Sequence, residues 1–384
     1  MKRSICVVVT ARPSYSRVKS LLEAIQEHPE LELRLVVSAS SLLERYGSVV
    51  NVMEKDGFEI AARVYMVLEG ENVTTMAKTT GIGLLELATA FDNLKPDVVV
   101  TIADRYETIS TAIAASYMNI PLAHIQGGEV TGSIDEKVRH AITKLADLHF
   151  VCTDMSANRL IRMGENPQVV FNTGCPSVDL ASRMLKEENS LVDTIDRYAG
   201  VGAKQHLSGQ YLVVLQHPVT TEHDEAFAQV QETLHAVRAL GVPTIWFWPN
   251  VDAGSDGTSK GIRKFRETED PANIFFLKNM EPPDFLRLIS NCACLVGNSS
   301  VAIREGAFLG VPSVNIGSRQ AGRERASNVI DVDYCQDSIQ KAISTHLNDG
   351  CCGQSELYGD GRSGKRIADL LSKVELKTEK KLMY

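Results

Sequence analysis

The stretch "ICVVVTARPSYSRVKSLLEAI" (residues 5–25) contains the unit from which the fold can be read. Its first five residues form a continuous apolar run, as in a strand that is buried on both faces. Val18, Leu21, Leu22 and Ile25 then recur at the spacing of one helix face. A buried strand, a polar turn and an amphipathic helix together indicate a parallel sheet covered by helices.

This unit recurs along the chain in two series. Further apolar runs of the first series lie at 33–38, 96–104, 121–126, 149–153 and 168–174, and those of the second at 211–218, 243–250, 273–279, 294–300 and 312–318. The fold class predicted is α/β, with two Rossmann-like domains and a central cleft. We expect the domains at 1–176 and 205–365, a connecting segment with a helix at 177–204, and a C-terminal helix and tail at 366–384.

Composition excludes several classes of protein. The chain has 384 residues, 44% of them apolar, and a net charge of -8, which disfavours nonspecific nucleic-acid binding. No apolar run approaches the roughly 20 residues of a membrane helix, and the N-terminal run is too short for a secretion signal. The eight cysteines lack metal-binding spacing. We therefore expect a cytoplasmic protein with free thiols, no metal, and neither nucleic acid nor membrane as a partner.

Polar residues collect where the predicted strands end. "ARPSYS", "DRYE" and "QGGE" follow apolar runs in the first half, and "QHPVTT", "PNVDAGS", "GNSS" and "GSRQAGRE" do so in the second. In parallel α/β sheets, ligands bind beyond the carboxyl ends of the strands. These clusters together predict one ligand site in the cleft. Neither a dinucleotide-binding G-x-G-x-x-G nor a P-loop motif is present, so neither NAD nor a P-loop nucleotide is indicated.

The loop "HIQGGEVTGSIDEKVRH" (residues 124–140) holds two adjacent glycines, several carboxylates, an arginine and two histidines. A connector needs only one or two turn residues, so this composition indicates a site. Glu129, Asp135, Arg139 and His140 are the candidate residues. The alternative for Asp135 is a plain cap of the helix that follows.

The second half offers candidates for binding an anion. In "VGNSSVAIREGAFLGVP" (residues 296–312), we expect Ser299 or Ser300 to cap a helix with Arg304 and Glu305 in its first turns. The segment is either an ordinary cap or a phosphate site at a helix N-terminus. Arg319 and Arg323 in "GSRQAGRE" add guanidinium groups, each of which can grip two oxygens of a diphosphate.

Three further residues lie at strand ends in the second half. His217 follows an apolar run and has either a structural role or a ligand-binding or catalytic one. Asn250 and Asp252 in "WPNVDAGS" either contact a ribose or base, or form an Asx turn.

These motifs, in this order, resemble the UDP-N-acetylglucosamine 2-epimerase family, and most closely its hydrolysing branch in sialic acid biosynthesis. The resemblance spans the chain from its first strand to "YGDG" (residues 358–361). It implies the two-domain GT-B fold, with UDP held mainly by the second domain and the sugar facing the first. It also implies no cofactor and a homodimer or homotetramer.

The resemblance assigns roles residue by residue. Arg12 and Ser16 match positions near the nucleotide phosphates, and Glu305 matches a ribose contact. The candidate catalytic residues are Asp104, Glu129, Asp135 and His217; the candidate substrate-binding residues are Arg12, Ser16, Arg105, Gln126, Gly128, Arg139, His140, Asn250, Asp252, Ser299, Ser300, Glu305, Arg319 and Gln320. Many relatives carry glutamate where this chain has Gln126. Because glutamine cannot take a proton, the acid or base must lie elsewhere, or the position serves only to orient other groups.

The activity implied is conversion of UDP-N-acetylglucosamine and water to N-acetylmannosamine and UDP. Elimination of UDP would give 2-acetamidoglucal, and hydration would then invert C2. Three alternatives remain open. The substrate is a UDP-2,4-diacetamido-2,4,6-trideoxyglucose on the route to legionaminic acid, or the protein is a GT-B glycosyltransferase, or it is a nucleotide-sugar sensor without turnover.

Overall fold

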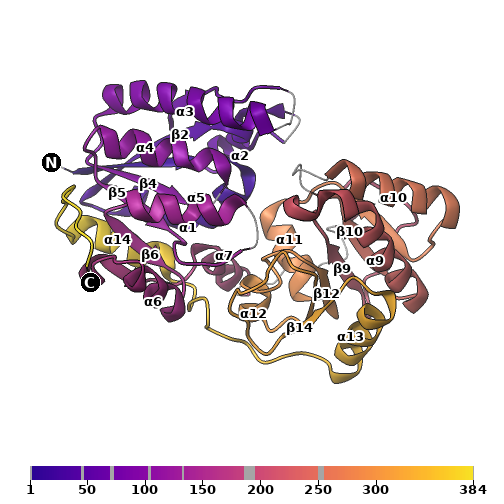
Figure 1. Ribbon diagram of the computed structural model, residues 1–384. Helices are drawn as coiled ribbons and strands as arrows, with labels where there is room; N and C mark the ends of the chain where they lie inside the picture. Colours follow the sequence, from indigo (N-terminus) through magenta and orange to yellow (C-terminus); the bar gives the residue numbers. More distant parts are fainter. Residues whose placement is uncertain are drawn as a thin grey trace. The chain divides into compact units, whose positions relative to one another are not determined.

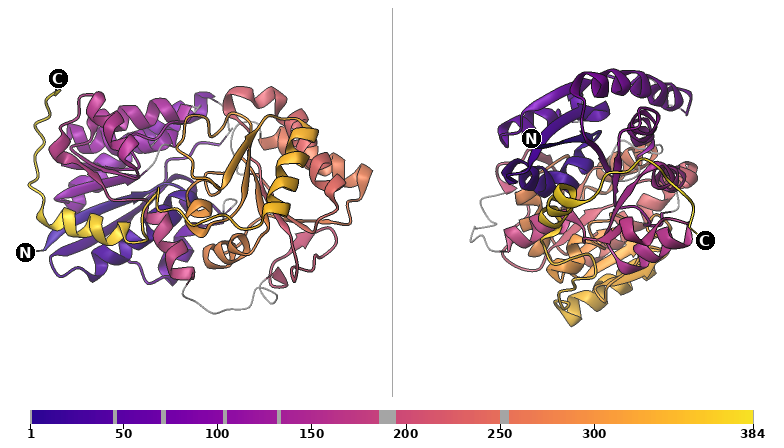
Figure 2. Two further views of the ribbon diagram at one scale, coloured as in Figure 1. Left: turned by 90° about the horizontal axis from the view of Figure 1, so that it is seen from below. Right: turned by 90° about the vertical axis from the view of Figure 1, so that its left-hand side faces the viewer.

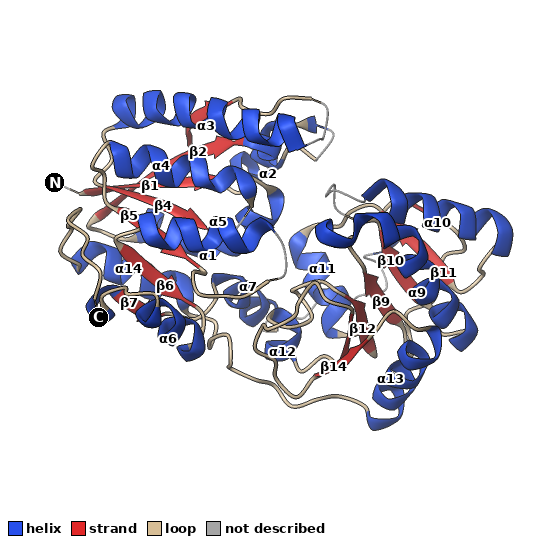
Figure 3. Ribbon diagram, viewed as in Figure 1, coloured by secondary structure: helices blue, strands red, loops and turns tan. Residues whose placement is uncertain are grey.

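The computed structural model describes residues 2–44, 47–69, 73–102, 105–131, 134–185, 195–249 and 255–383 (Figure 1). It divides into two compact units. The first unit comprises Met1–Glu129, Ile134–Asp179 and Gly359–Tyr384, and the second comprises Val130–Ser133 and Leu180–Tyr358. Each unit is built on a largely parallel sheet, shown by the red strands in Figure 3. The prediction of two parallel-sheet α/β domains is confirmed.

In the first unit, a wholly parallel sheet has the strand order β3-β2-β1-β4-β5-β6-β7. The order reverses between β1 and β4, which makes this the topological switch point where ligands bind in such sheets. The strands are β1 (Arg3–Val9), β2 (Leu31–Ser38), β3 (Ile60–Val64), β4 (Val98–Ile102), β5 (Leu122–Ile125), β6 (Leu148–Val151) and β7 (Val170–Asn172). The helices are α1 (Arg12–Glu27), η1 (Ala39–Leu42), α2 (Val49–Lys55), α3 (Val73–Leu94), η3 (Tyr106–Thr108), α4 (Ile109–Tyr117), α5 (Ile134–Leu145), α6 (Asp154–Arg162), η4 (Pro167–Val169) and α14 (Ser363–Lys373).

Apolar side chains of the first sheet pack on both of its faces. Ile5, Val7 and Val9 of β1 join a buried cluster with α1 and α14, whereas Cys6 and Val8 join one with α3 and α4. The helix face predicted for α1 is confirmed, because Val18, Leu21, Leu22 and Ile25 are all fully buried in the first of these clusters. The strand–helix pattern of the sequence therefore follows from burial on both sides of the sheet.

The C-terminal segment returns to the first unit. Figure 2 shows α14, in yellow, beside the indigo N-terminal elements. The amides of Ser363 and Gly364 donate to the carboxylate of Asp179 at 2.9 and 2.7 Å, which satisfies the first donors of α14. Nothing in the local sequence of α14 indicates this partner, because the two segments are about 180 residues apart.

In the second unit, the strand order is β14-β13-β12-β9-β10-β11-β8, and it reverses between β9 and β12. All neighbours pair in parallel except β8, which runs antiparallel to β11. The strands are β8 (Gly200–Val201), β9 (Leu212–Leu215), β10 (Thr244–Phe247), β11 (Ile274–Leu277), β12 (Cys294–Gly297), β13 (Ser313–Ile316) and β14 (Val329–Val332). The helices are α7 (Pro176–Met184), which begins in the first unit, η5 (Thr220–Glu225), α9 (Ala226–Leu240), α10 (Ser255–Glu269), α11 (Pro282–Ser290), α12 (Glu305–Leu309) and α13 (Gln336–Asp349).

Three strands have no counterpart in the sequence prediction: β3, β8 and β14. All three lie at sheet edges, where strands are only partly buried. An edge strand needs no continuous apolar run, which is why the pattern missed them. None of the eight cysteines is in a disulfide, and five of them are buried. Within the described ranges, no helix is both long and apolar enough to span a bilayer.

Candidate active site

At the switch point of the second unit, Asn298 holds the backbone of His217. His217 follows β9 and Asn298 follows the neighbouring β12. The His217 amide donates to Asn298 Oδ1 at 2.8 Å, and Asn298 Nδ2 donates to the His217 carbonyl at 2.8 Å. Asn298 is fully buried, and His217 is 7% exposed. These two hydrogen bonds to the side-chain amide of Asn298 therefore fix the backbone of His217, from which the imidazole projects.

The same asparagine also ties in the loop after β13. The backbone carbonyl of Asn298 accepts hydrogen bonds from Arg319 Nη1 at 3.1 Å and from Gln320 Nε2 at 2.9 Å. Three residues predicted from sequence, His217, Arg319 and Gln320, are thus brought together around Asn298. Asn298 belongs to the motif "GNSS" but was not among the residues predicted to form the site. The available signal was its place directly after β12, where the strand order reverses.

Gly297 allows this close approach of two strand ends. Its φ is 129°, and a Cβ at this position would lie 2.2 Å from the carbonyl oxygen of Leu215. No other residue fits without moving the backbone of β9. The glycine before Asn298 is therefore required by the hydrogen-bonded bridge to His217.

The prediction that Ser299 or Ser300 caps a helix is wrong. Helix α12 begins only at Glu305 and spans five residues. Ala302 and Ile303 donate to the carbonyls of Ser299 and Ser300, so residues 299–304 form tight turns. The buried Arg304 donates from Nη2 to Ser300 Oγ at 2.8 Å and holds this geometry. The helix-start phosphate site expected here is therefore not formed by a helix N-terminus.

Glu305 has a carboxylate oxygen that accepts no hydrogen bond from the described residues. Its side chain is nearly buried, and in the part of the chain that the structure describes its Oε2 has no hydrogen-bond partner. A buried acceptor without a donor costs about 1–3 kcal/mol. A hydroxyl-bearing ligand or water would remove that cost, which is consistent with the ribose contact implied by the resemblance.

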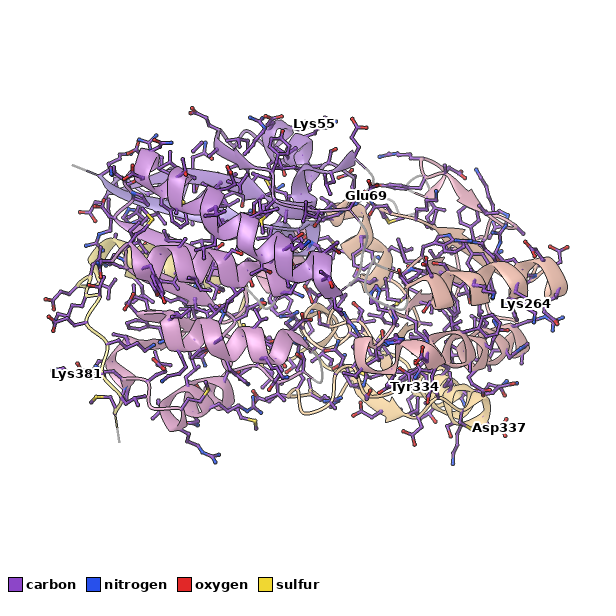
Figure 4. All side chains as sticks on the ribbon, turned by 45° about the horizontal axis from the view of Figure 1, so that its top comes forward. Lys55, Glu69, Lys264, Tyr334, Asp337 and Lys381 are labelled. Carbon is purple, nitrogen blue, oxygen red and sulfur yellow. The ribbon has the colours of Figure 1, made fainter. Side chains whose placement is uncertain are left out.

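Tyr334 shapes the loop after β13. It follows β14 and is labelled in Figure 4. Gly317, with φ 72°, lies so close that a Cβ there would be 2.3 Å from the tyrosine ring. Burial, and then the negative charge of Glu222, raises the pKa of Tyr334 to about 12. Tyr334 therefore packs as a neutral phenol against the loop that carries Arg319.

At the switch point of the first unit, Arg12 opens α1, and Ser16 lies one turn later with its hydroxyl 3.5 Å from the Arg12 carbonyl. Beyond β4, Arg105 Nε donates to Glu107 Oε1 at 2.8 Å. Arg105 is 29% exposed and the Glu107 side chain 2% exposed. Asp104 lies outside the described residues, as do Asn250 and Asp252 of the second unit.

The loop after β5 holds Gln126 in a fixed orientation. Gln126 is buried, has φ 66°, and donates from Nε2 to Cys175 Sγ at 3.1 Å. Cys175 Sγ in turn lies 3.0 Å from Ser177 Oγ. Gly128, with φ 75°, would place a Cβ 2.4 Å from the Ser156 carbonyl, so only glycine fits. The hydrogen bond to the thiol of Cys175 therefore orients the side-chain amide of Gln126.

Helix α5 brings the remaining first-unit candidates together. Arg139 is 1% exposed and donates from Nη1 to the Glu129 carbonyl at 2.9 Å and to Glu136 Oε2 at 3.0 Å. The other oxygen of Glu136 lies 2.8 Å from His140 Nε2. Glu136 was missed by sequence analysis, although its i, i+3 and i, i+4 spacing to Arg139 and His140 was a usable signal. A carboxylate between two cationic or hydrogen-bonding side chains orients both.

Asp135 lies in the first turn of α5, after the first helical residue, Ile134. It is therefore not the N-cap of this helix, so the plain-cap alternative is wrong. Within the described ranges, no group of three or more histidine, cysteine or acidic side chains is placed to hold a metal ion.

Comparison with known proteins identifies the family. The family model for UDP-N-acetylglucosamine 2-epimerase matches residues 23–372. UDP-N,N'-diacetylbacillosamine 2-epimerase (hydrolyzing) of Legionella pneumophila is 34% identical over 379 residues, covering 99% of this chain and 98% of the relative. Polysialic acid biosynthesis protein P7 of Escherichia coli is 33% identical over 346 residues, covering 89% and 85%.

A solved structure shows the same fold. The crystal structure of UDP-GlcNAc 2-epimerase from Neisseria meningitidis bound to UDP-GlcNAc aligns with a TM-score of 0.81 at 17% identity, covering 96% of this chain and 99% of that one. The two parallel-sheet units thus match the GT-B-like fold of these structures. From the match to the family model and the identity to its relatives, this chain belongs to the UDP-N-acetylglucosamine 2-epimerase family.

Proposed function

We propose that the protein is a hydrolysing 2-epimerase that releases UDP from a UDP-linked 2-acetamido sugar and inverts C2 of that sugar. The observation that carries this proposal is the arrangement around Asn298, which holds an imidazole, a guanidinium and an amide at a topological switch point. Membership of the family supports the reaction class.

The reaction needs two kinds of group. The C2 proton is not next to a carbonyl, so it becomes acidic only when loss of UDP from C1 builds positive charge in the ring. A base then removes it to give a 2-acetamidoglucal. Water adds at C1, and a proton returns to C2 from the opposite face. The departing diphosphate therefore needs positive charge, and the two faces of C2 need separate proton carriers.

The second unit is proposed to bind UDP. Arg319 supplies a guanidinium that can grip two diphosphate oxygens, with Gln320, Ser299 and Ser300 as neighbouring donors. Glu305 is proposed to accept hydrogen bonds from the ribose, since its Oε2 lacks a donor among the described residues. His217, fixed by Asn298, is proposed as one proton carrier.

The first unit is proposed to supply the remaining sugar contacts and proton carriers. Glu129, Asp135 and Asp104 are the carboxylates available, and Arg12, Ser16 and Arg105 are proposed to face the phosphates. Arg139 holds the backbone of Glu129 and so fixes its position. Gln126, whose amide donates to Cys175, is proposed to orient the loop and the substrate, with no part in proton transfer.

Two sugars fit this chemistry. The Legionella relative is named for UDP-N,N'-diacetylbacillosamine, which is the 2,4-diacetamido-2,4,6-trideoxyglucose of the first alternative, and the Neisseria structure holds UDP-GlcNAc. We place the diacetamido sugar first because the Legionella protein is 34% identical to this chain over 379 residues, whereas UDP-N-acetylglucosamine 2-epimerase of Neisseria meningitidis is 28% identical over 379 residues. N-acetylmannosamine as product, and a role in sialic acid synthesis, form the second candidate.

A substrate comparison tests the proposal. The purified protein is given each UDP-sugar separately, and UDP release and the free sugar are measured together. We expect equimolar UDP and free 2-epimerised sugar, with kcat/KM at least about tenfold higher for the preferred substrate. A glycosyltransferase would release UDP only with an acceptor, and a sensor would bind the nucleotide sugar without releasing UDP. Either of those results would refute the proposed function.

A further inference from the structure

The first unit contains a buried carboxylate that the proposed site does not explain. Glu107 lies in η3, just beyond β4, with its side chain 2% exposed. Its Oε1 accepts the hydrogen bond from Arg105 Nε at 2.8 Å. Its Oε2 is buried and has no hydrogen-bond partner within the described part of the chain. The contact thus engages one carboxylate oxygen and leaves the other unsatisfied.

Five buried hydroxyls in the same region also lack partners among the residues described. Val8, Val36 and Val99 all pack in the cluster under α3 and α4. Two residues further along each strand come Thr10, Ser38 and Thr101, so alternation places these side chains on the same face. Together with Glu107 they form the buried polar cluster, whose members are Thr10, Ser38, Ser41, Thr101, Glu107 and Thr111.

Thr111 lies one helical turn after Glu107, in α4. The turn η3 runs directly into α4, since Thr108 and Ile109 both have helical φ and ψ, so residues 107 and 111 project from the same side of the chain. Both belong to the layer that covers the sheet near its carboxyl edge, since Ala112 and Ala115 of α4 pack into the cluster below. These groups therefore lie at the carboxyl ends of the neighbouring strands β1, β2 and β4, and in the helical turns η1, η3 and α4 beyond them.

Without water, a buried cluster of polar atoms that lack hydrogen-bond partners would cost too much free energy of folding. Each buried unpaired polar group costs about 1–3 kcal/mol, and a carboxylate costs more. Total stabilities of proteins are only about 5–15 kcal/mol. Buried waters, each making about three hydrogen bonds, remove this cost. A sugar nucleotide is excluded as the occupant because every member of the cluster is at most 2% exposed.

We propose that Glu107 is a positioning residue that fixes Arg105 for the substrate, and that buried water on Glu107 Oε2 and Thr111 holds its carboxylate in place. The Nε contact restricts the rotamers of Arg105, whose side chain is partly exposed. The guanidinium then loses less conformational freedom when it meets an anion. This proposal rests on the proposed function only through the role of Arg105.

A kinetic double-mutant cycle tests the positioning role. We expect Glu107→Gln and Glu107→Ala to lower kcat/KM by roughly tenfold or more, mainly through KM, with the glutamine variant less affected. In an Arg105→Ala background, either change should have no further effect, because the two residues act as one unit. Thr111→Val should act in the same direction by about threefold. Wild-type kinetics in Glu107→Ala, or additive effects in the cycle, would overturn the proposal.

Glu165→Gln is the matched control, since Glu165 is also a buried carboxylate of the first unit. It should lower the melting temperature without changing KM. If Glu165→Gln raises KM as much as Glu107→Gln does, loss of any buried carboxylate produces the effect. That result would contradict the positioning role of Glu107.

A crystallographic readout stands apart from activity. We expect an ordered water about 2.6–3.2 Å from both Glu107 Oε2 and Thr111 Oγ1, and several Arg105 conformers in Glu107→Ala. A dry cluster, or an unchanged Arg105, contradicts the inference even if turnover is absent. Conversely, an inactive wild-type protein with a hydrated cluster and a fixed Arg105 refutes the proposed function alone.

Discussion

Two buried carboxylates of the first unit, Glu165 and Glu107, differ in how completely they are satisfied. Glu165 is 1% exposed, and its oxygens meet Lys144 Nζ at 2.6 Å, Lys380 Nζ at 2.6 Å and His149 Nε2 at 3.0 Å. Glu107 has Arg105 alone on one oxygen, and its other oxygen has no partner within the described ranges. Glu165 precedes β7, near the amino edge of the sheet, whereas Glu107 follows β4 at the carboxyl edge.

The difference separates carboxylates whose hydrogen bonds are completed by the protein from carboxylates that need water or substrate to complete them. Burial alone would raise the pKa of Glu165, but hydrogen bonds from His149, Lys144 and Lys380 outweigh it and lower the pKa to about 2. At the carboxyl edges, by contrast, acceptors such as Glu107 Oε2 and Glu305 Oε2 have no donor in the described structure. Buried polar atoms are normally paired, so these exceptions indicate sites where water or substrate completes the bonding.

The largest effect on activity is expected for a change of His217, which lies at the carboxyl edge of the second sheet. Because it is proposed as a proton carrier, His217→Gln should lower kcat by about 10²–10⁴-fold while leaving the melting temperature nearly unchanged. UDP release measures the first quantity and calorimetry the second. His223→Gln is the control, since that nearby histidine is 55% exposed and should retain activity. A His217→Gln variant with the kcat of the wild type would show that His217 is not a proton carrier.

Asn298→Asp should give the next largest effect. Aspartate keeps the acceptor for the His217 amide but loses the donor to the His217 carbonyl. We expect kcat/KM to fall by about 10–100-fold and the free energy of unfolding by about 1–3 kcal/mol. Denaturant unfolding and UDP release are the measurements. Asn291→Asp, at a helix end away from the switch point, is the control. If the two variants behave alike, the hydrogen bonds between Asn298 and the backbone of His217 have no functional role.

At the amino edge, Glu165→Gln should change stability alone. The change leaves Lys144, Lys380 and His149 around a neutral amide, so we expect a loss of about 3 kcal/mol in the free energy of unfolding. Urea unfolding measures this loss, and kcat and KM should match the wild type. Altered kinetics without lost stability would reverse the distinction drawn between the two edges.

The side chains around Glu165 predict that the free energy of unfolding depends on pH. Burial lowers the pKa of His149 below its ordinary value of 6.5, despite the bond to Glu165 and with Lys380 and Lys144 adding to the shift. Because the unfolded state then binds protons more readily, stability should fall as pH drops below about 6.5, and further between 4.5 and about 2 as Glu165 is protonated. His149→Gln should flatten the upper part of this curve. A wild-type curve that is flat from pH 7 to 5 would contradict the burial of a neutral His149.

The smallest effect is expected at Gln126. If it only orients its loop, Gln126→Glu loses the donor to Cys175 and should lower kcat/KM less than about tenfold. The pH profile of kcat should keep the shape of the wild type. A new ionisation in that profile would show that the position can take part in proton transfer. Cys175→Ser, which keeps a small polar group, is the matched control.

The sequence predicts the local pattern of the fold better than its long-range contacts. Apolar runs and the face of α1 follow from burial in a covered parallel sheet, which leaves a pattern within a few residues. The edge strands β3, β8 and β14 leave no such pattern. The wrong cap assigned to Ser299 and Ser300 has a similar cause, since the buried Arg304 decides the turn geometry and its burial is set by the tertiary fold.

The site was predicted in part. The structure brings His217, Arg319 and Gln320, all selected from the sequence, together around Asn298, because polar residues after buried strands gather at one edge. Asn298, Glu136 and Glu107 were not selected, because their roles depend on hydrogen bonds to other side chains or to distant backbone. The cluster around Glu165 joins Lys144 to Lys380, which are too far apart in sequence for any local pattern to connect.

Proton NMR of the reaction in deuterated water tests the proposed chemistry most directly. With UDP-N,N'-diacetylbacillosamine or UDP-N-acetylglucosamine as substrate, we predict release of UDP and a free 2-epimerised sugar with deuterium at C2. Deuterium would show that the C2 proton left and was replaced from solvent. A free sugar that retains its original C2 proton, or a UDP-sugar that stays intact with both substrates, would contradict the account.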